Sequence, residues 1–333
     1  MSTYSILKYT DAYKSRWDRF AASLNGTYKG SKNTSFLFQR NFMEYHKNRF
    51  EDFSLMVFDG EHVLAILPAN KLGEVLYSHQ GLSYGGLVLD AEIRLETVLE
   101  IFKELLCFLS QSGIKMLEIK VLPQFYQELP GEELDYLLFL TEARLVKAET
   151  ASVIDMRNRI PLHSSRKDGI RKAKNKGLKI LETKDFKPFW ETILIPNLQL
   201  RHDAIPVHSL EEISMLAKKF PYNIRQFNVL NQEGIVVAGA TIFETPAVAH
   251  VQYISANKDR QQLGSLDYLF DFLISEYYKD KHYFDFGTSN EEAGRKLNGG
   301  LQFWKEGFGA RARVQRTYEV ATVNYKMLNG VVL

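Results

Sequence analysis

Apolar and polar positions alternate in the same order at two places in the chain. FSLMVFDGEHVLAILPAN, from residue 53, has two apolar runs around Asp59 and Gly60, and YNIRQFNVLNQEGIVVAGATIFET, from residue 222, has two runs around residues 231–234. Apolar runs rich in β-forming residues, on either side of a short polar loop with glycine, are typical of hairpins. The sequence therefore predicts an antiparallel hairpin at each place.

The elements expected after each hairpin also repeat. A third extended run follows, then a long helix with apolar residues at three- and four-residue spacing, near 95–109 and 266–277. Each helix leads to a short strand, KMLEIKV or HYFDFG, and then to a further helix and strand. The order predicts an antiparallel meander joined by a crossover helix to a parallel neighbour, with helices on the sheet faces.

We interpret the repeat as two copies of one α/β unit with a mixed sheet, an N-terminal domain at 1–160 and a C-terminal domain with inserted helices at 161–333. The chain has 333 residues, 45% of them hydrophobic, which is enough for two cores. A single cysteine, Cys107, fits a reducing compartment. The N-terminus has no apolar leader, and no apolar run approaches 18 residues, so we expect a cytoplasmic protein without a membrane span. The oligomeric state stays open.

Charge is concentrated in one helix, although the net charge of the chain is only +2. RKDGIRKAKNKGLKI, residues 166–180, has a single anion, and its seven cations include Arg171 and Lys172. Ser165 with Asp168 predicts a cap at its start, and Gly177 a left-handed end. The helix either contacts the phosphates of CoA, a nucleotide-linked precursor or tRNA, or is only a solvated surface.

The last third of the chain has a family resemblance. YFDFGTSNEEAGRKLNGGLQFWKEGFGARARVQRTYEV is similar to the closing segment of Fem-related GNAT proteins, with Asp-Phe-Gly ending a strand and an aromatic-Lys pair that includes Lys305. SSRKDGIRKAKNKGLKI resembles their Arg-x-x-Ile-x-x-Ala-x-x-x-Gly segment. The strand and helix order resembles the GNAT acyltransferase fold, and its duplication resembles the Fem-type peptidyltransferases. The resemblance thus implies tandem GNAT-like domains.

The resemblance also implies a donor. GNAT enzymes hold the pyrophosphate of acyl-CoA, such as acetyl-CoA, on backbone N–H groups of a Q/R-x-x-G-x-G/A loop. QQLGSL is the matching place, with Gln261, Gly264 and Ser265 as the expected cofactor-binding residues. Leu266 stands where glycine or alanine is usual and crowds that approach. An aminoacyl-tRNA donor, as in Fem proteins, is the alternative, and we expect no metal.

Acyl transfer to an amine needs a base and a group that stabilises the oxyanion. His250, Gln252 and Tyr253 on the fourth strand, with Asp285 on the fifth, are expected where those strands separate. Strict alternation puts His250 and Gln252 on one face and Tyr253 on the other, so the three cannot all be active. The alternative for His250 is an ordinary strand histidine. Asp285 ends an apolar strand, so it is either a base of raised pKa or a cap for the following turn.

The remaining candidates are for substrate binding, a role also expected of Gln252, Lys305, Arg171 and Lys172. RHDAIPVH contains Arg201 and His202, without a convincing third metal ligand. YSHQGLSYGG contains His79 and Tyr84, and its glycines, Gly85 and Gly86, permit either a close backbone approach to a ligand or a bulge.

We therefore expect an N-acyltransferase that moves an acyl or aminoacyl group to an amine of a small or peptidoglycan-type cell-envelope precursor. The alternative is a binding module with degenerate GNAT domains that holds a peptide, glycan or tRNA. tRNA contact through the basic helix is a possible partner interaction in both cases.

Overall fold

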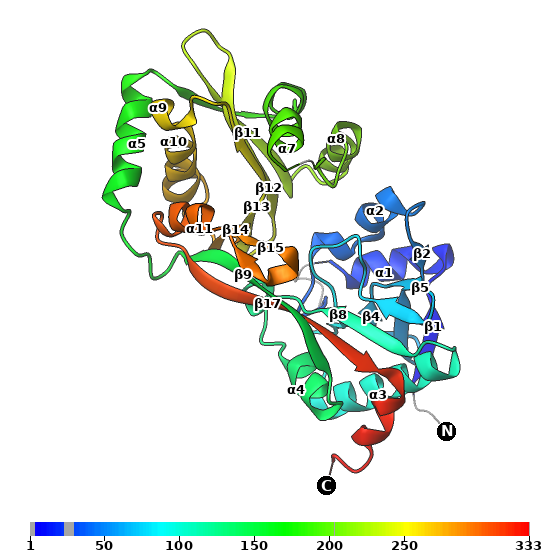
Figure 1. Ribbon diagram of the computed structural model, residues 1–333. Coiled ribbons are helices and arrows are strands. Elements are labelled where there is room, and N and C mark those ends of the chain that lie inside the picture. The colour runs from blue at the N-terminus through cyan, green and yellow to red at the C-terminus, as the bar shows by residue number, and fades with distance from the viewer. Residues whose placement is uncertain (1–3, 23–29, 203, 333) are drawn as a thin grey trace. The chain divides into compact units, whose positions relative to one another are not determined.

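The computed structural model describes residues 4–22, 30–202 and 204–332 and divides the chain into two compact units (Figure 1). The first unit runs to Glu149 and includes Val314 onward, whereas the second is Thr150–Arg313. The end of the chain returns to the first unit because strand β17 (Arg311–Ala321) pairs antiparallel with β8 (Met116–Lys120). The predicted domains, 1–160 and 161–333, assigned the end of the chain to the second domain, because apolar patterning does not show which strands pair.

The first unit has two sheets. One has the order β1-β3-β4-β7, and β17-β8-β6-β5-β2 are neighbours in the other. Its strands are β1 (Ser5–Lys8), β2 (Glu51–Asp52), β3 (Leu55–Asp59), β4 (His62–Leu67), β5 (Asn70–Leu72), β6 (Val75–Tyr77), β7 (Val88–Leu89), β8 and the start of β9 (Arg144–Asp155). Its helical segments are η1 (Asp11–Tyr13), α1 (Lys14–Phe20), η2 (Phe36–Phe38), α2 (Arg40–Met43), η3 (Glu44–His46), α3 (Leu95–Gln111), η4 (Gln124–Tyr126), α4 (Glu133–Leu140) and η8 (Thr322–Leu328).

The predicted hairpin is β3 and β4, with Gly60 at φ 55° in its turn. The third extended run is split into two strands. β6 pairs parallel with β8, whereas β7 pairs antiparallel with β4. The connecting loop brings Gly85 so close to Ser78 that a Cβ on Gly85 would lie 1.9 Å from the Ser78 carbonyl oxygen. The close approach at Gly85 is thus to the backbone of the chain itself, and an approach of the Gly85-Gly86 pair to a ligand stays a prediction.

Helix α3 contributes a large part of the first core. Its apolar stripe is buried from Val98 to Leu109, as the spacing predicts, and packs with Leu117 and Ile119 of β8. Leu95 belongs to the predicted stripe but is exposed, because it is the first residue of the helix.

The second unit is one sheet in the order β10-β11-β12-β13-β14-β9, with a separate small ribbon β15-β16. Its strands are the end of β9, β10 (Lys179–Thr183), β11 (Ile224–Leu230), β12 (Val236–Glu244), β13 (Val248–Ala256), β14 (Tyr283–Thr288), β15 (Asn290–Glu291), β16 (Lys296–Leu297) and the start of β17. Its helical segments are α5 (Ser164–Asn175), α6 (Lys187–Phe189), η5 (Trp190–Leu194), α7 (Ile195–His202), α8 (Leu210–Lys219), α9 (Arg260–Leu263), α10 (Ser265–Phe272), η6 (Leu273–Tyr277), η7 (Glu292–Gly294) and α11 (Gly299–Glu306).

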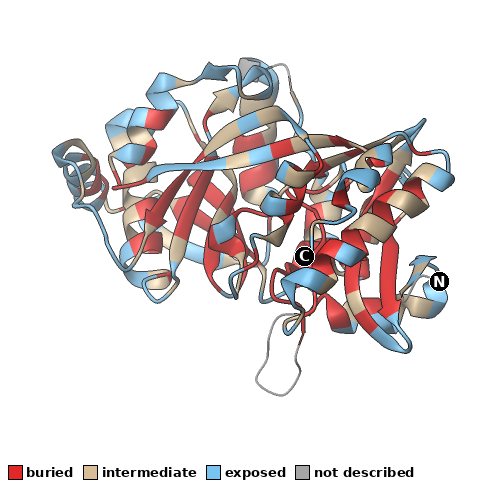
Figure 2. Ribbon diagram, turned by 90° about the horizontal axis from the view of Figure 1, so that it is seen from below, coloured by how far each residue is buried: buried red, intermediate tan, exposed pale blue. Residues whose placement is uncertain are grey.

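The predicted meander and crossover are present in this unit. β11, β12 and β13 are antiparallel neighbours, and β14 follows α10 and pairs parallel with β13. Helices α5, α9 and α10 lie on one side of the sheet, and α7 and α8 on the other (Figure 1). The strands between them carry buried residues, red in Figure 2, including Phe227, Ala240 and Phe284. The α/β class with mixed sheets is confirmed.

Candidate functional site

Polar side chains gather where β13 and β14 separate. The two strands pair only from Val248 to His250, opposite Tyr283 to Asp285, although β13 continues to Ala256. The ladder between β14 and β9 is also irregular between Asp285 and Thr288, and Gly287 there has φ 70°. The sequence predicted its catalytic candidates for this point of separation.

A β-bulge at Gln252 changes which of these side chains share a face. Thr241 pairs with Tyr253 and Ile242 with Val251, so Gln252 is an extra residue in β13. His250 pairs with Phe243, and residues directly opposite each other share a face. His250 and Tyr253 are therefore on the same face, and the expectation from strict alternation was wrong. Asp285, opposite His250, is on that face as well.

His250 and Asp285 form a hydrogen-bonded pair. The distance from His250 Nδ1 to Asp285 Oδ2 is 2.8 Å, and Asp285 is completely buried. The other oxygen, Oδ1, accepts a hydrogen bond from the Gly287 N–H at 2.7 Å. A carboxylate only accepts, so Nδ1 carries the proton, and in the neutral ring Nε2 carries the lone pair. Asp285 thus both caps the turn at Gly287 and orients the imidazole.

Lys305 brings a cation to the same place. Asn298 caps α11 by accepting from the Leu301 N–H, and Gln302 and Lys305, three residues apart, form the buried face of the helix. The Lys305 ammonium donates to Gly287 O at 3.0 Å and Thr288 O at 2.7 Å. Burial lowers the pKa of Lys305 to about 8, and the negative charge of Asp285 opposes this change. Lys305 therefore titrates close to neutral pH.

The lowered pKa makes a prediction about stability. Between pH 8 and 10.5 the unfolded lysine holds a proton that the folded one has lost, so raising the pH stabilises the fold. We expect the unfolding free energy of wild type, relative to Lys305→Met, to rise by about 2–3 kcal/mol across this window and to be flat below it. Urea denaturation at several pH values measures the difference. Parallel curves for the two proteins would show that the Lys305 pKa is not lowered.

Tyr253 has a partner on the same face. Its hydroxyl lies 2.7 Å from His208 Nδ1, and its ring packs against Trp190 with centroids 4.8 Å apart. Burial raises the pKa of Tyr253 to about 12, so the phenol stays protonated at neutral pH. The neighbouring Gln252 Oε1 is buried and accepts no hydrogen bond from the described residues. The bulge therefore places an unsatisfied acceptor beside the point of strand separation.

The expected donor loop is covered. Gln261 is exposed, but Gly264 and Ser265 are buried, and a Cβ on Gly264 would lie 2.0 Å from the Gly169 carbonyl oxygen of α5. Arg166 of α5 forms an ion pair with Asp267 at 2.6 Å, and Asp267 also accepts from Trp304 Nε1 at 2.9 Å. Helix α5 thus lies directly on the first turn of α10, the turn that would have to receive a pyrophosphate.

The other substrate-binding candidates do not join this cluster. Arg171 and Lys172 are exposed on α5. The side chains of Arg201 and His202 lie outside the described part of the structure. His79 and Tyr84 belong to the first unit.

His79 and Tyr84 are both buried there. Burial, with the nearby His46, lowers the pKa of His79 to about 3. The Tyr84 hydroxyl hydrogen-bonds with Ser35 Oγ at 2.9 Å. His79 is therefore neutral at physiological pH and is not an anion-binding charge.

Among the described residues, no group of His, Cys, Asp and Glu side chains is arranged to hold a metal ion. No helix in the same part of the chain has the length and apolarity needed to cross a membrane.

Solved structures share this fold at low sequence identity. FemX aligns with a TM-score of 0.66 and 12% identity, over 98% of this chain and 99% of its own. The C-terminal domain of a putative lysylphosphatidylglycerol synthetase from Agrobacterium fabrum has a TM-score of 0.53 and 12% identity, over 80% of this chain and 84% of its own. A tandem GNAT protein from the clavulanic acid biosynthesis pathway has a TM-score of 0.50 and 11% identity, over 96% of this chain and 98% of its own.

At the level of sequence, no family model and no curated protein matches the chain. The structural likenesses extend over most of the chain and therefore bear on its whole architecture. The protein has the tandem GNAT fold that its sequence predicted, and it shares that fold with FemX.

Proposed function

We propose that the protein is an N-acyltransferase that moves an acyl or aminoacyl group to an amine. The observation that carries the proposal is the His250–Asp285 pair beside Lys305, where β13 and β14 separate. An oriented imidazole next to a titrating amine matches what acyl transfer requires. Its position in a GNAT fold agrees with this chemistry, since the neighbours include a tandem GNAT protein.

His250 acts as the base in this proposal. Nε2 accepts a proton from the acceptor amine as its nitrogen attacks the donor carbonyl, and Asp285 stabilises the imidazolium that forms. An amide bond forms, the ester or thioester bond of the donor breaks, and the proton passes to the leaving oxygen or sulfur. Gln252 Oε1, buried at the bulge, is a suitable acceptor for a second N–H of the incoming amine.

Lys305 supplies positive charge where negative charge develops. Two of the three N–H groups of its ammonium donate hydrogen bonds to the carbonyl oxygens of Gly287 and Thr288, and these hydrogen bonds fix the position of the ammonium. A fixed cation in a buried site stabilises an oxyanion without reorganisation. With a pKa of about 8, Lys305 is also matched to protonating the leaving group near neutral pH.

Two observations favour aminoacyl-tRNA over acyl-CoA as the donor. Helix α5 covers Gly264 and Ser265, so the first turn of α10 offers no open phosphate site. The outer surface of the same helix carries Arg171, Lys172 and Lys174, all exposed. Exposed cations along one helix suit a polyanion backbone better than a single pyrophosphate. We propose an amine of a peptidoglycan-type or other small precursor as the acceptor.

A competition between donors tests the proposal. The protein is incubated with bulk tRNA carrying radiolabelled amino acids, with acetyl-CoA carrying a second label, and with a nucleotide-linked peptidoglycan precursor that has a free amine. We expect transfer of the amino acid label, with His250→Gln greatly reducing its rate. Transfer of the acetyl label would assign the donor to CoA. No transfer of either label would contradict catalysis and favour the binding module.

The basic helix is tested in the same experiment with a quadruple variant, Arg171, Lys172, Lys174 and Lys176 each to Gln. We expect tRNA affinity to fall about 10- to 100-fold at low salt, and its salt dependence to flatten by about one unit of slope per lost phosphate contact. Stability should change little because exposed charges contribute little to folding.

The matched control replaces four exposed cations of the first unit with Gln: Lys47, Arg94, Lys115 and Lys326. It removes the same net charge elsewhere, so it should retain most of the affinity. Equal tRNA affinity for wild type and the α5 variant at two ionic strengths would leave the helix as a solvated surface.

A further inference from the structure

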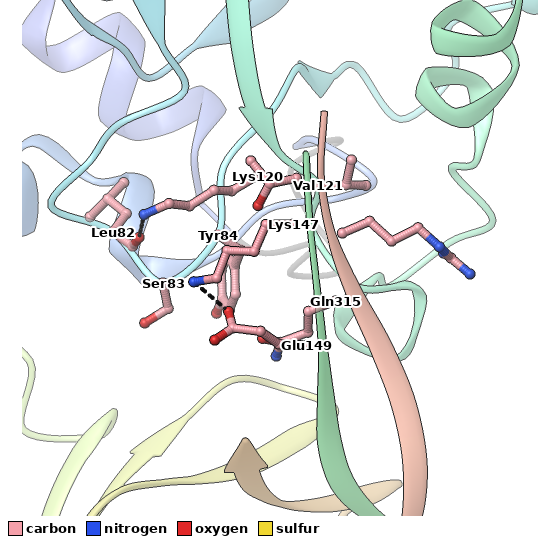
Figure 3. Close-up of a pocket in the computed structure, with 10 residues that line it drawn as sticks. Leu82, Ser83, Tyr84, Lys120, Val121, Lys147, Glu149 and Gln315 are labelled. Carbon is pink, nitrogen blue, oxygen red and sulfur yellow. Dashed lines mark hydrogen bonds and ion pairs between the residues drawn. The ribbon is translucent and has the colours of Figure 1, made fainter. Parts of the chain in front are cut away.

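The first unit contains a polar pocket that lies outside the His250–Asp285–Lys305 cluster. It has a volume of about 100 Å³, ample for a small organic group because a single water needs about 10–15 Å³. Figure 3 shows its walls: Leu82, Ser83 and Tyr84 of one loop, Lys120 at the end of β8, Lys147 and Glu149 of β9, and Gln315 of β17. All of these residues belong to the first unit.

Because side chains alternate between the two faces of a strand, polar side chains of β8, β9 and β17 share the face that lines this pocket. Lys147 and Glu149 are two residues apart on β9, as are Gln315 and Thr317 on β17, so each pair projects from one face. Thr317 is directly opposite Lys120 on β8 and shares its face. These polar side chains therefore converge, although the strands that carry them are far apart in the sequence.

Two ammonium groups meet in the pocket with one carboxylate. Lys120 Nζ is held by the carbonyl oxygens of Leu82 at 3.1 Å and Gln80 at 3.4 Å. Lys147 Nζ pairs with Glu149 at 2.7 Å (Figure 3). Burial, followed by the charge of Lys147, lowers the pKa of Lys120. The charges of Lys120, Lys147 and Glu149 add up to one positive charge. Arg316 also contributes to the pocket wall, but its side chain alternates to the other face of β17 from Gln315 and Thr317 and interacts with Asp135. Glu118, two residues before Lys120, interacts electrostatically with both lysines but does not line the pocket.

We propose that this pocket binds the carboxylate group of a small molecule or peptide. A monoanion balances the remaining positive charge, whereas a phosphate dianion would exceed it and face Glu149 at close range. Of the three N–H bonds of Lys120, the two carbonyls take two and leave the third for a ligand oxygen. The hydroxyl of Ser83 and the amide of Gln315 are additional donors on the pocket wall. The pocket lining does not include His250, Asp285 or Lys305.

Direct binding tests the site without any catalytic assay. Saturation-transfer NMR on the full chain is recorded with acetate, with N-acetylglycine as a minimal peptide carboxyl terminus, and with N-acetylglycinamide as its neutral analogue. We expect saturable binding of both acids and none of the amide. Lys120→Gln should weaken binding about tenfold, the effect of removing a charged hydrogen-bond partner. Tighter binding of N-acetylglycine than of acetate would indicate a peptide source, and equal binding a free acid.

The matched control is Lys115→Gln, which removes an exposed lysine immediately before the same strand. It should bind both acids as wild type does. If Lys120→Gln fails to fold, Lys147→Gln provides the test, since that side chain is partly exposed and should also weaken binding. Equal signals from the acid and the amide, or unchanged affinity in the pocket variant, would each overturn the proposal. So would inorganic phosphate, added as a competitor, if it displaced N-acetylglycine at a lower concentration than acetate does.

Discussion

Replacing Asp285 with Asn should lower the rate of acyl transfer by about 10²–10⁴-fold, the usual contribution of an acid–base group. The asparagine presents an N–H toward His250 where the carboxylate accepted one. Nδ1 must then accept, the proton moves to Nε2, and Nε2 can no longer take a proton from the acceptor amine. The oxygen of the new amide can still accept from the Gly287 N–H, so the turn keeps its cap.

The unfolding free energy of Asp285→Asn should fall by no more than about 3 kcal/mol. Loss of a buried partner is costly. However, the pKa of Lys305 is about 8, so Lys305 can release its proton instead of remaining an uncompensated charge. Single-turnover rates and denaturation curves measure the two effects separately, with the exposed Asp280→Asn as the control. A folded Asp285→Asn variant with the wild-type rate would remove the pair from the mechanism.

Replacing Gly264 with Ala should reduce the unfolding free energy by about 2–5 kcal/mol. Gly264 has φ 65°, where an L-residue is strained by about 1–2 kcal/mol. Its new Cβ would also lie 2.0 Å from the Gly169 carbonyl oxygen, and forced overpacking costs about 1–3 kcal/mol. Helix α5 or the start of α10 must move to relieve the clash. Urea denaturation gives the size of the loss.

Gly234→Ala separates the two causes. Gly234 has φ 76°, but a Cβ there meets nothing within 4 Å, so only the backbone strain of about 1–2 kcal/mol applies. The difference between the two variants measures how tightly α5 lies on α10. Equal losses would mean that α5 does not press on the donor loop, and the argument against acyl-CoA would fail with it.

Local patterns predicted the elements well. The two hairpins and the stripe from Val98 to Leu109 depend on residues close in sequence, and they are present. Gly177 ends its helix with φ 64°, as predicted. The predicted start of that helix was wrong by two residues: α5 begins at Ser164, and the side chain of His163, not Ser165, accepts the capping hydrogen bond.

The site was predicted in part. The spacing of β13 and β14 placed His250 and Asp285 together, but alternation cannot reveal the extra residue at Gln252 that brings Tyr253 to their face. Lys305 was expected from the aromatic-Lys pair, whereas its lowered pKa depends on burial beneath Gly287 and Thr288. The pocket at Lys120 has no signal in the sequence, because its walls come from four separate segments.

The return of β17 to the first unit affects the order in which the chain can fold during synthesis. Domains usually fold from the N-terminus onward as the ribosome releases them. Here the second unit, Thr150–Arg313, is one continuous segment, whereas the first lacks a strand beside β8 until Val314 and the residues after it have been made. The first unit is therefore translated first, but it can complete its sheet only after the second unit has been made. Its exposed strand edge at β8 needs protection until translation is complete.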